Sequence, residues 1–330
     1  MRRLPAEWEK QDSILVSFPH ANTDWENDLQ SAISVFVRMA SSICFNQKLI
    51  LICDDIEKTK ELFCYHDKIS FVKLKTNDTW IRDYGPITIY EDEKRKLIDF
   101  QFNAWGGKFK HFHDNKITKQ LHEKWHFGVS ELEKEEFILE GGSIESDGQG
   151  TILTTSKCLL DPNRNPYLNK QQIEEKLKTT LGAKRILWLN HGELIGDDTD
   201  AHIDTLARFV DENTIAYVTC EKDDEHYAEL QMMKKELESF KTNEGNPYKL
   251  IPLPLPQAKH AEGERLPATY ANFLIANHVV LLPTYEDSLD KEMISLFKEL
   301  FPTREIIPIN AMRLIEEGGS VHCSTMHISF

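Results

Sequence analysis

Short runs of apolar, often β-branched residues alternate with longer amphipathic stretches along the chain. Short apolar runs are typical of buried strands, whereas apolar residues that recur every three or four positions indicate helices. The predicted strands are residues 14–18, 48–53, 69–74, 97–102, 186–189, 214–219, 278–283 and 305–309. The predicted helices are residues 26–43, 55–65, 116–124, 170–181, 224–240 and 289–300.

This alternation of strands and helices predicts an α/β fold. The chain has 330 residues, and no Ser/Gly-rich linker or long charge block divides it. We therefore expect a single domain spanning residues 1–330. The proline-rich segment 251–256 is the one candidate seam, but its alternating apolar residues and prolines suit an edge strand or an extended loop equally well.

Charge and composition exclude some classes of protein. The formal net charge is −15, which argues against nucleic acid as a partner because phosphate binding needs clustered Lys and Arg. An acidic surface suits a cationic small molecule, although many cytosolic proteins are acidic for solubility alone. The sequence shows no apolar signal-peptide core near Met1 and no run long enough to cross a bilayer. We therefore expect a soluble, cytoplasmic protein without a membrane partner, and the sequence leaves homo-oligomerisation open.

The six cysteines are scattered and form no CxxC pair. This spacing indicates neither a zinc site nor a disulfide framework. Five of them lie in or beside apolar stretches, where cysteine usually acts as a small buried hydrophobe. Cys323 differs, because glycines and a histidine precede it.

Four short segments combine acids and glycines with a His, Cys or Trp. They are NDTWIRDYGP at 77–86, EGGS at 140–143, GDDTDAHID at 196–204 and EEGGSVHCST at 316–325. Gly-Pro at 85–86 fixes how the first segment leads into a strand at 87–90. Paired glycines allow close approach of the backbone in the second.

Together these segments hold the groups that a guanidinium-modifying enzyme needs. A guanidinium is planar and cationic, so carboxylates bind it through paired hydrogen bonds and an aromatic face can cover it. A thiolate can attack its central carbon, while a histidine protonates the departing ammonia and then activates water. His202 and Asp204 would point to one face if residues 202–204 formed a strand. The candidates are Cys323, His202, Asp83, Asp204, Glu140 and Trp80. Taken singly, each of them except Cys323 would more often have a structural role.

At these residues the sequence resembles the agmatine deiminases, whose broader family includes the bacterial peptidylarginine deiminases. The motifs that carry the resemblance lie in the family's order along nearly the whole chain: WIRDYGP at 80–86, FNAWGG at 102–107, EGGS at 140–143, HID at 202–204 and GGSVHCST at 318–325. The resemblance implies a five-bladed α/β propeller with pseudo-fivefold symmetry and a central active site. It also implies hydrolysis of agmatine to N-carbamoylputrescine and ammonia, within polyamine and putrescine biosynthesis and without metal or cofactor.

The resemblance also implies a role for each candidate. Cys323 resembles the nucleophile, which forms a covalent thiouronium intermediate, and His202 resembles the general acid/base. Asp83 and Asp204 resemble the guanidinium-binding carboxylates. The remaining two assignments are Glu140 as the acid that pairs with the histidine and Trp80 as a residue that packs against the substrate.

Two departures from the family pattern concern the edges of this site. Position 201 is Ala where the family usually has Gly, and Met326 and His327 stand where the family tends to have Gln. Three rival functions stay open: a deiminase of free or peptidyl arginine, an amidinotransferase with the same Cys-His chemistry, and a non-enzymatic propeller that only binds. An arginine deiminase should place Arg residues near the substrate's carboxylate, and a pure binding protein should have lost Cys323 or His202.

Overall fold

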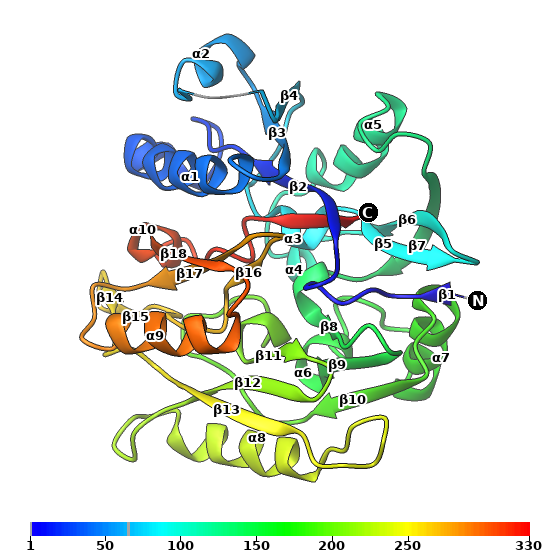
Figure 1. Ribbon diagram of the computed structural model, residues 1–330, viewed down its shortest axis with the longest axis vertical. Helices are drawn as coiled ribbons and strands as arrows, with labels where there is room; N and C mark the ends of the chain where they lie inside the picture. The colour runs from blue at the N-terminus through cyan, green and yellow to red at the C-terminus, as the bar shows by residue number, and fades with distance from the viewer. Residues whose placement is uncertain (1, 65–66) are drawn as a thin grey trace.

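The computed structural model describes residues 2–64 and 67–330, and the strands in that part of the chain form five mixed sheets and one two-stranded hairpin. The long helices lie at the periphery, outside the sheets (Figure 1). The α/β prediction is confirmed.

The first sheet has the order β1 (Arg2–Arg3), β5 (Ile87–Glu91), β6 (Lys94–Gln101), β7 (Glu131–Ile138). The second contains β8 (Ile144–Ser146), β9 (Thr151–Thr155) and β10 (Arg185–Leu189), and the third β11 (Ala207–Asp211), β12 (Thr214–Thr219) and β13 (Lys249–Pro254). The fourth contains β16 (Leu274–Ile275), β17 (Val279–Thr284) and β18 (Glu305–Asn310). The last has the order β19 (Met326–Ser329), β2 (Gln11–Ser17), β3 (Lys48–Cys53), β4 (Ile69–Lys73), and the hairpin is β14 (His260–Ala261) with β15 (Glu264–Arg265).

The helices and helical turns connect these strands. The α-helices are α1 (Leu29–Cys44), α2 (Ile56–Lys60), α3 (Ile81–Tyr84), α4 (Ala104–Gly107), α5 (Ile117–Glu123), α6 (Ser156–Leu159), α7 (Lys170–Leu181), α8 (Tyr227–Ser239), α9 (Asp290–Leu300) and α10 (Met312–Ile315). The 3-10 turns are η1 (Asp24–Asp28), η2 (Asp114–Lys116), η3 (Gly141–Ser143) and η4 (Ile203–Thr205). No helix within residues 2–64 and 67–330 is long and apolar enough to span a bilayer.

All five sheets contain the same strand arrangement. In each, an antiparallel pair is followed by a parallel pair, as in β8–β9–β10, β11–β12–β13 and β16–β17–β18. The strands of each parallel pair are joined through a helix, such as α8 between β12 and β13, because parallel strands need a crossover connection. In the last sheet the C-terminal β19 supplies the antiparallel partner of β2, a strand from near the start of the chain (Figure 1).

Most predicted elements occur with small shifts of their ends. All eight strands are present, and the proline-rich segment is the edge strand β13. The predicted helix 55–65 is wrong in length, because α2 ends at Lys60; its predicted last residue, Tyr65, lies outside the described residues. After α2 the chain turns inward and buries Phe63 against Phe18 and Phe71. Burial of this aromatic side chain favours the turn over another helical turn.

Candidate active site

Three of the predicted site residues meet around one glycine. A Cβ atom added to Gly142 would lie 2.7 Å from His202 Nδ1, 2.9 Å from Asp83 Oδ1 and 3.0 Å from Asp204 Oδ2. These residues come from three short helical turns, since Asp83 lies on α3, Gly142 on η3, and Asp204 on η4. Only a residue without a side chain allows such close approach, which explains the paired glycines of the second segment.

Asp83 is buried where these turns meet, and its carboxylate accepts hydrogen bonds from two donors. The backbone N–H of Gly142 donates to Oδ1 at 2.9 Å, and Trp105 Nε1 donates to Oδ2 at 3.0 Å. Burial, together with the nearby charge of Glu140, raises the pKa of Asp83 to about 7. A carboxylate that is desolvated in this way gains most from a cationic ligand.

His202 is fully buried, and it precedes the turn η4 rather than lying on a strand, so the strand prediction for residues 202–204 is wrong. The carbonyl of His202 accepts hydrogen bonds from both N and Oγ1 of Thr205, which close the turn. Neither ring nitrogen has a hydrogen-bond partner in the described part of the chain. Nδ1 lies 3.6 Å from Asp83 Oδ1. Burial, followed by the charges of Arg164 and Lys108, holds the pKa of His202 well below its usual range.

Glu140 bonds to an arginine that the sequence reasoning did not include. Arg164 Nε donates to both carboxylate oxygens, at 2.9 and 3.1 Å, and Arg164 also donates to Asp200 Oδ2 at 2.8 Å. A carboxylate oxygen of Glu140, a ring nitrogen of His202 and Cys158 Sγ all lie within 4.8 Å of one another. Glu140 therefore lies close to His202, but no hydrogen bond joins the two side chains within the described residues. The same three groups could in principle ligate a metal, but the Arg164 guanidinium already uses both Glu140 oxygens and opposes a second cation.

Cys323 lies between Asp204 and an asparagine. Asn272 Nδ2 donates to Cys323 Sγ at 3.2 Å, and Asp204 Oδ2 lies 3.9 Å from the same sulfur. Asn272 Oδ1 accepts from the backbone N–H of His322 at 2.9 Å, while Arg82 N donates to the carbonyl of Cys323 at 3.1 Å. Burial, followed by the negative charges of Asp204 and Asp83, raises the pKa of the Cys323 thiol well above its usual range.

All six cysteines, every one of them within the described residues, are free. Cys44, Cys53 and Cys158 are buried as expected, but Cys64 is exposed, so the expectation of burial is wrong there. Asn272 was missed because a lone asparagine in an apolar stretch carries no local signal. Arg164 was missed for the same reason, since only its contact with Glu140 marks it.

A cavity of about 270 Å³ leads to Cys323. Among the described residues that line it, none is Lys or Arg, whereas six are acids: Asp24, Asp78, Asp83, Asp198, Glu316 and Glu317. Three aromatic residues complete its wall, namely Trp80, Trp105 and Phe109. Trp80 lies directly against Gly319, where a Cβ atom would collide with its ring. Arg313, which is not in the lining, pairs with Glu316 and Glu317. The cavity still has an excess of negative charge beside its aromatic faces, which suits an organic cation.

Burial in the cavity wall raises the pKa of several of its acids. Burial, aided by the charge of Asp197, raises the pKa of Asp198 to about 6, and burial raises the pKa of Glu317 as well. Burial raises the pKa of Asp78 well above its usual range. Carboxyl groups whose charged forms are disfavoured in the empty cavity become more acidic when a cation enters.

Comparison with known proteins places this geometry in context. Residues 3–328 match the model of the Porphyromonas-type peptidyl-arginine deiminase family. A Legionella pneumophila protein named as a candidate agmatine deiminase is 35% identical over 98% of this chain and 93% of its own length. The structure of a C. jejuni agmatine deiminase, a cysteine-to-serine variant with substrate bound, has a TM-score of 0.94 and 41% identity, covering 100% of this chain and 97% of that one. A Porphyromonas gingivalis structure described as a candidate arginine deiminase has a TM-score of 0.95 and 44% identity, covering 99% and 98%.

Proposed function

This chain belongs to the Porphyromonas-type peptidyl-arginine deiminase family, and we propose that it is an agmatine deiminase, a hydrolase that acts on a C–N bond of a linear amidine. It converts agmatine and water to N-carbamoylputrescine and ammonia. The observation that carries the choice of substrate is the acidic cavity without Lys or Arg among its described lining residues. Agmatine carries a guanidinium at one end and an ammonium at the other, so acids suit both ends.

In the proposed mechanism the guanidinium binds between Asp83 and Asp204. Asp83 Oδ1 and Oδ2 already accept one hydrogen bond each, and Asp204 Oδ1 is unpartnered within the described residues. Two buried carboxylates facing a planar cation orient its central carbon toward Cys323. Trp80 packs against the substrate from the cavity wall.

Cys323 then attacks the central carbon of the guanidinium, and its thiol proton passes to His202. His202 returns this proton to the departing nitrogen, so that ammonia leaves and a covalent thiouronium remains on the sulfur. A neutral His202 next takes a proton from water, which attacks the same carbon. The thiolate leaves as the C=O bond forms, the hydroxyl proton is released and leaves with ammonia as ammonium, and His202 returns its proton to the sulfur. The low pKa of His202 keeps the imidazole unprotonated before each proton transfer to it. Glu140, fixed by Arg164, lies within 4.8 Å of a ring nitrogen of His202 and contributes negative charge beside it.

Bound substrate would also help to form the thiolate. Burial disfavours the thiolate in the empty site, and so does any negative charge on Asp204 or Asp83, so the pKa of Cys323 is raised. A guanidinium between Asp83 and Asp204 neutralises much of that repulsion. No cofactor or metal takes part in this scheme.

A deiminase of free or peptidyl arginine is the second candidate, favoured by the similarity to the Porphyromonas gingivalis structure. Such an enzyme must bind an α-carboxylate or a peptide backbone. The two cations beside the cavity acids are already engaged: Arg313 pairs with Glu316 and Glu317, and Lys108 Nζ contacts Asp200 Oδ1 at 2.8 Å and the carbonyl of Asp198. The cavity thus offers little positive charge to bind the α-carboxylate of an arginine substrate. An amidinotransferase would use the same nucleophile and requires an acceptor amine in place of water.

An ammonia-release assay on agmatine, free arginine and an arginine-containing peptide tests the proposal. We expect release from agmatine at least tenfold faster than from either arginine substrate. Cys323→Ala serves as the control, since it should release no ammonia yet still bind agmatine. Faster release from arginine would assign the second function, and no release from any guanidine would refute the deiminase.

We also propose that the five sheets are the blades of a five-bladed propeller with pseudo-fivefold symmetry, in one catalytic domain spanning residues 1–330. The repeated strand arrangement supports this, as does the closure of the last sheet by β19 and β2. A cytoplasmic location and a role in polyamine biosynthesis follow from the same proposal, while homo-oligomerisation stays open.

A further inference from the structure

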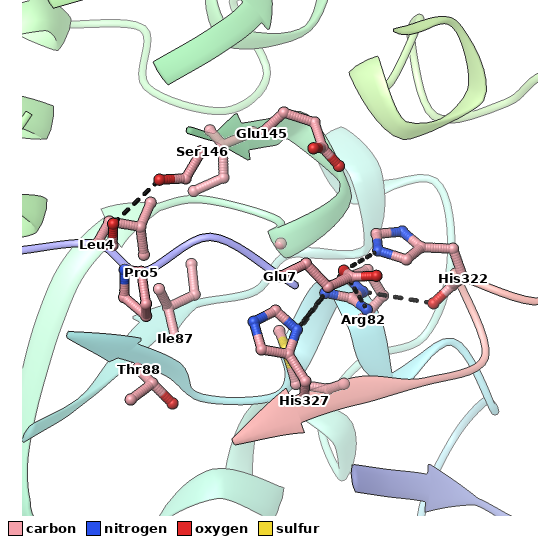
Figure 2. Close-up of a pocket in the computed structure, with 13 residues that line it drawn as sticks. Leu4, Pro5, Glu7, Arg82, Ile87, Thr88, Glu145, Ser146, His322 and His327 are labelled. Carbon is pink, nitrogen blue, oxygen red and sulfur yellow. Dashed lines mark hydrogen bonds and ion pairs between the residues drawn. The ribbon is translucent and has the colours of Figure 1, made fainter. Parts of the chain in front are cut away.

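Three side chains far apart in the sequence form one hydrogen-bonded chain behind the candidate site. His322 Nδ1 lies 2.7 Å from Asp204 Oδ2, and His322 Nε2 lies 2.7 Å from Glu7 Oε2. All three residues are buried. Asp204 contacts the Cys323 sulfur, whereas Glu7 lines a second, small cavity of about 50 Å³ on the other side of His322. Figure 2 shows this second cavity, with Glu7 between His322 and His327 and beside Arg82.

The geometry fixes the number of protons in this chain. A carboxylate oxygen and a ring nitrogen approach to 2.7 Å only when a proton lies between them. Both contacts of His322 therefore require one, and a neutral imidazole carries a single N–H. Two protons are thus shared among Asp204, His322 and Glu7. Either the histidine is an imidazolium between two carboxylates, or it is neutral and one of the carboxyl groups is protonated.

The surroundings decide which carboxyl group holds the extra proton in the empty site. Glu7 Oε1 lies 3.2 Å from Arg208 Nη2 and accepts from Ile275 N at 2.7 Å, and Glu7 Oε2 lies 3.3 Å from Arg82 Nη2. Burial disfavours ionised Glu7, but His322, Arg208 and Arg82 together hold its pKa well below its usual range. Burial and the charge of Asp83 raise the pKa of Asp204 well above its usual range. The proton therefore resides on Asp204.

The remaining charged groups near His322 agree with this state. Burial, then the charges of Arg208 and Arg82, hold the pKa of His322 well below its usual range, so the ring is neutral while Asp204 keeps its proton. His327 Nδ1 lies 3.6 Å from Glu7 Oε2 and 3.2 Å from Arg82 Nη1, and Glu145 pairs with Arg208. These groups lie around Glu7, which stays ionised. Asp204 and His322 are therefore the two residues that can exchange the proton.

We infer that His322 is a positioning residue that holds Asp204 Oδ2 and accepts its proton when a guanidinium binds at Oδ1. The proton moves along the existing Oδ2–Nδ1 hydrogen bond; Asp204 becomes a carboxylate facing the substrate, and His322 becomes an imidazolium that donates through Nε2 to ionised Glu7. No proton has to leave the buried site for Asp204 to ionise. This inference rests on the proposed function, since it requires a guanidinium ligand.

Two substitutions at His322 separate its two contacts. The amide of Asn can reach the position of Nδ1, and the amide of Gln the position of Nε2. His322→Gln should therefore lose the donor to Asp204, and we expect KM for agmatine to rise about tenfold or more, the effect of losing a hydrogen bond to a charged group. His322→Asn keeps that donor, so KM should stay within about threefold. A purely structural histidine would reduce the amount of folded enzyme and leave KM unchanged in both variants.

The pH profile tests the proton transfer itself. An amide cannot accept the proton of Asp204, so in His322→Asn that proton must go to solvent. We expect the acidic limb of kcat/KM to shift upward by about one pH unit or more. Glu7→Gln keeps an acceptor for Nε2 but removes the charge that favours the imidazolium, and it should shift the same limb in the same direction. It also serves as an independent test if a His322 variant fails to fold.

The matched control is His327→Gln, which alters a histidine of the same cavity that does not touch Asp204. Its KM and acidic limb should stay within twofold and about 0.3 pH units of the wild type. If the wild type releases ammonia but His322→Gln has an unchanged KM, or Glu7→Gln has an unchanged profile, the inference is overturned. If the wild type releases no ammonia from agmatine, and Cys323→Ala does not bind it by calorimetry, the proposed function itself fails instead.

Discussion

Two groups of carboxylates lie on opposite sides of His322, and they differ in how their charge is compensated. On the cavity side, no Lys or Arg is among the described residues that line the path to Cys323, and Arg313 pairs with two of the six acids there, Glu316 and Glu317. On the inner side, Glu7 and Glu145 are paired with Arg82 and Arg208. Uncompensated acids are available to a cationic ligand, whereas paired acids hold the scaffold together. Asp204 lies between the two groups, because one oxygen bonds to His322 and the other has no partner within residues 2–64 and 67–330.

The largest effect should come from breaking the compensated side. Arg208→Met leaves Glu145 and Glu7 buried beside fewer positive charges, and removing one partner of a buried ion pair costs about 3–5 kcal/mol. Urea unfolding should show this loss in the free energy of unfolding. Lys48→Met is the control, because Lys48 pairs with Asp12 at the exposed surface and should change stability by less than about 1 kcal/mol. Equal losses in the two variants would contradict the distinction between the groups.

On the cavity side, ionisation of Asp83 should cost stability. The raised pKa, about 7, means that folded Asp83 keeps a proton that the unfolded chain has already lost between about pH 4 and 7. Stability is therefore higher at low pH and falls as pH rises through this window. Asp83→Asn has no charge to bury, so its free energy of unfolding relative to the wild type should increase from pH 5 to pH 8 by a few kcal/mol at most, on the order expected for such a shift. If the two proteins differ in free energy of unfolding by the same amount at pH 5 and pH 8, burial does not raise the pKa of Asp83.

The same substitution should impair catalysis, because the guanidinium loses a charged partner. We expect kcat/KM for agmatine to fall about tenfold to a hundredfold, with KM raised and kcat lowered. Steady-state kinetics above pH 7 measure this where wild-type Asp83 is ionised. Asp99→Asn alters a buried acid outside the cavity and should leave both constants within twofold. An unchanged KM in Asp83→Asn would remove Asp83 from the guanidinium site.

The smallest effect should come from the acids farther from the reacting carbon. Asp198→Asn removes one charge from a wall that carries several, and we expect KM to rise about threefold, with less effect at high salt because ions screen exposed charges. Kinetics at low and high ionic strength check this. Glu299→Gln, on the exposed face of α9, removes the same net charge at a distance and should have no measurable effect. A similar change in both variants would indicate overall charge rather than a local contact.

Element type followed largely from local pattern, while element ends did not. Apolar runs such as residues 214–219 coincide with β12, because a buried strand needs apolar residues whatever its neighbours are. β7 was not predicted, since Glu131–Ile138 is rich in charged residues; pairing with β6 makes it a strand. Phe63 similarly ends the helical region after α2 through its contacts with Phe18 and Phe71.

The sequence by itself determined the inventory of reactive groups, because the chemistry of Cys323, His202, Asp83 and Asp204 is a property of each side chain and their order along the chain is typical of a family. Only the tertiary structure decided which partner each group has. It placed Arg164 against Glu140, Asn272 against Cys323, and Glu7 against His322 across most of the chain. The physical reason is that ionisation and hydrogen bonding depend on distance and burial, which long-range contacts set. These contacts separate the acids that are free to bind a cation from the acids that stabilise the fold.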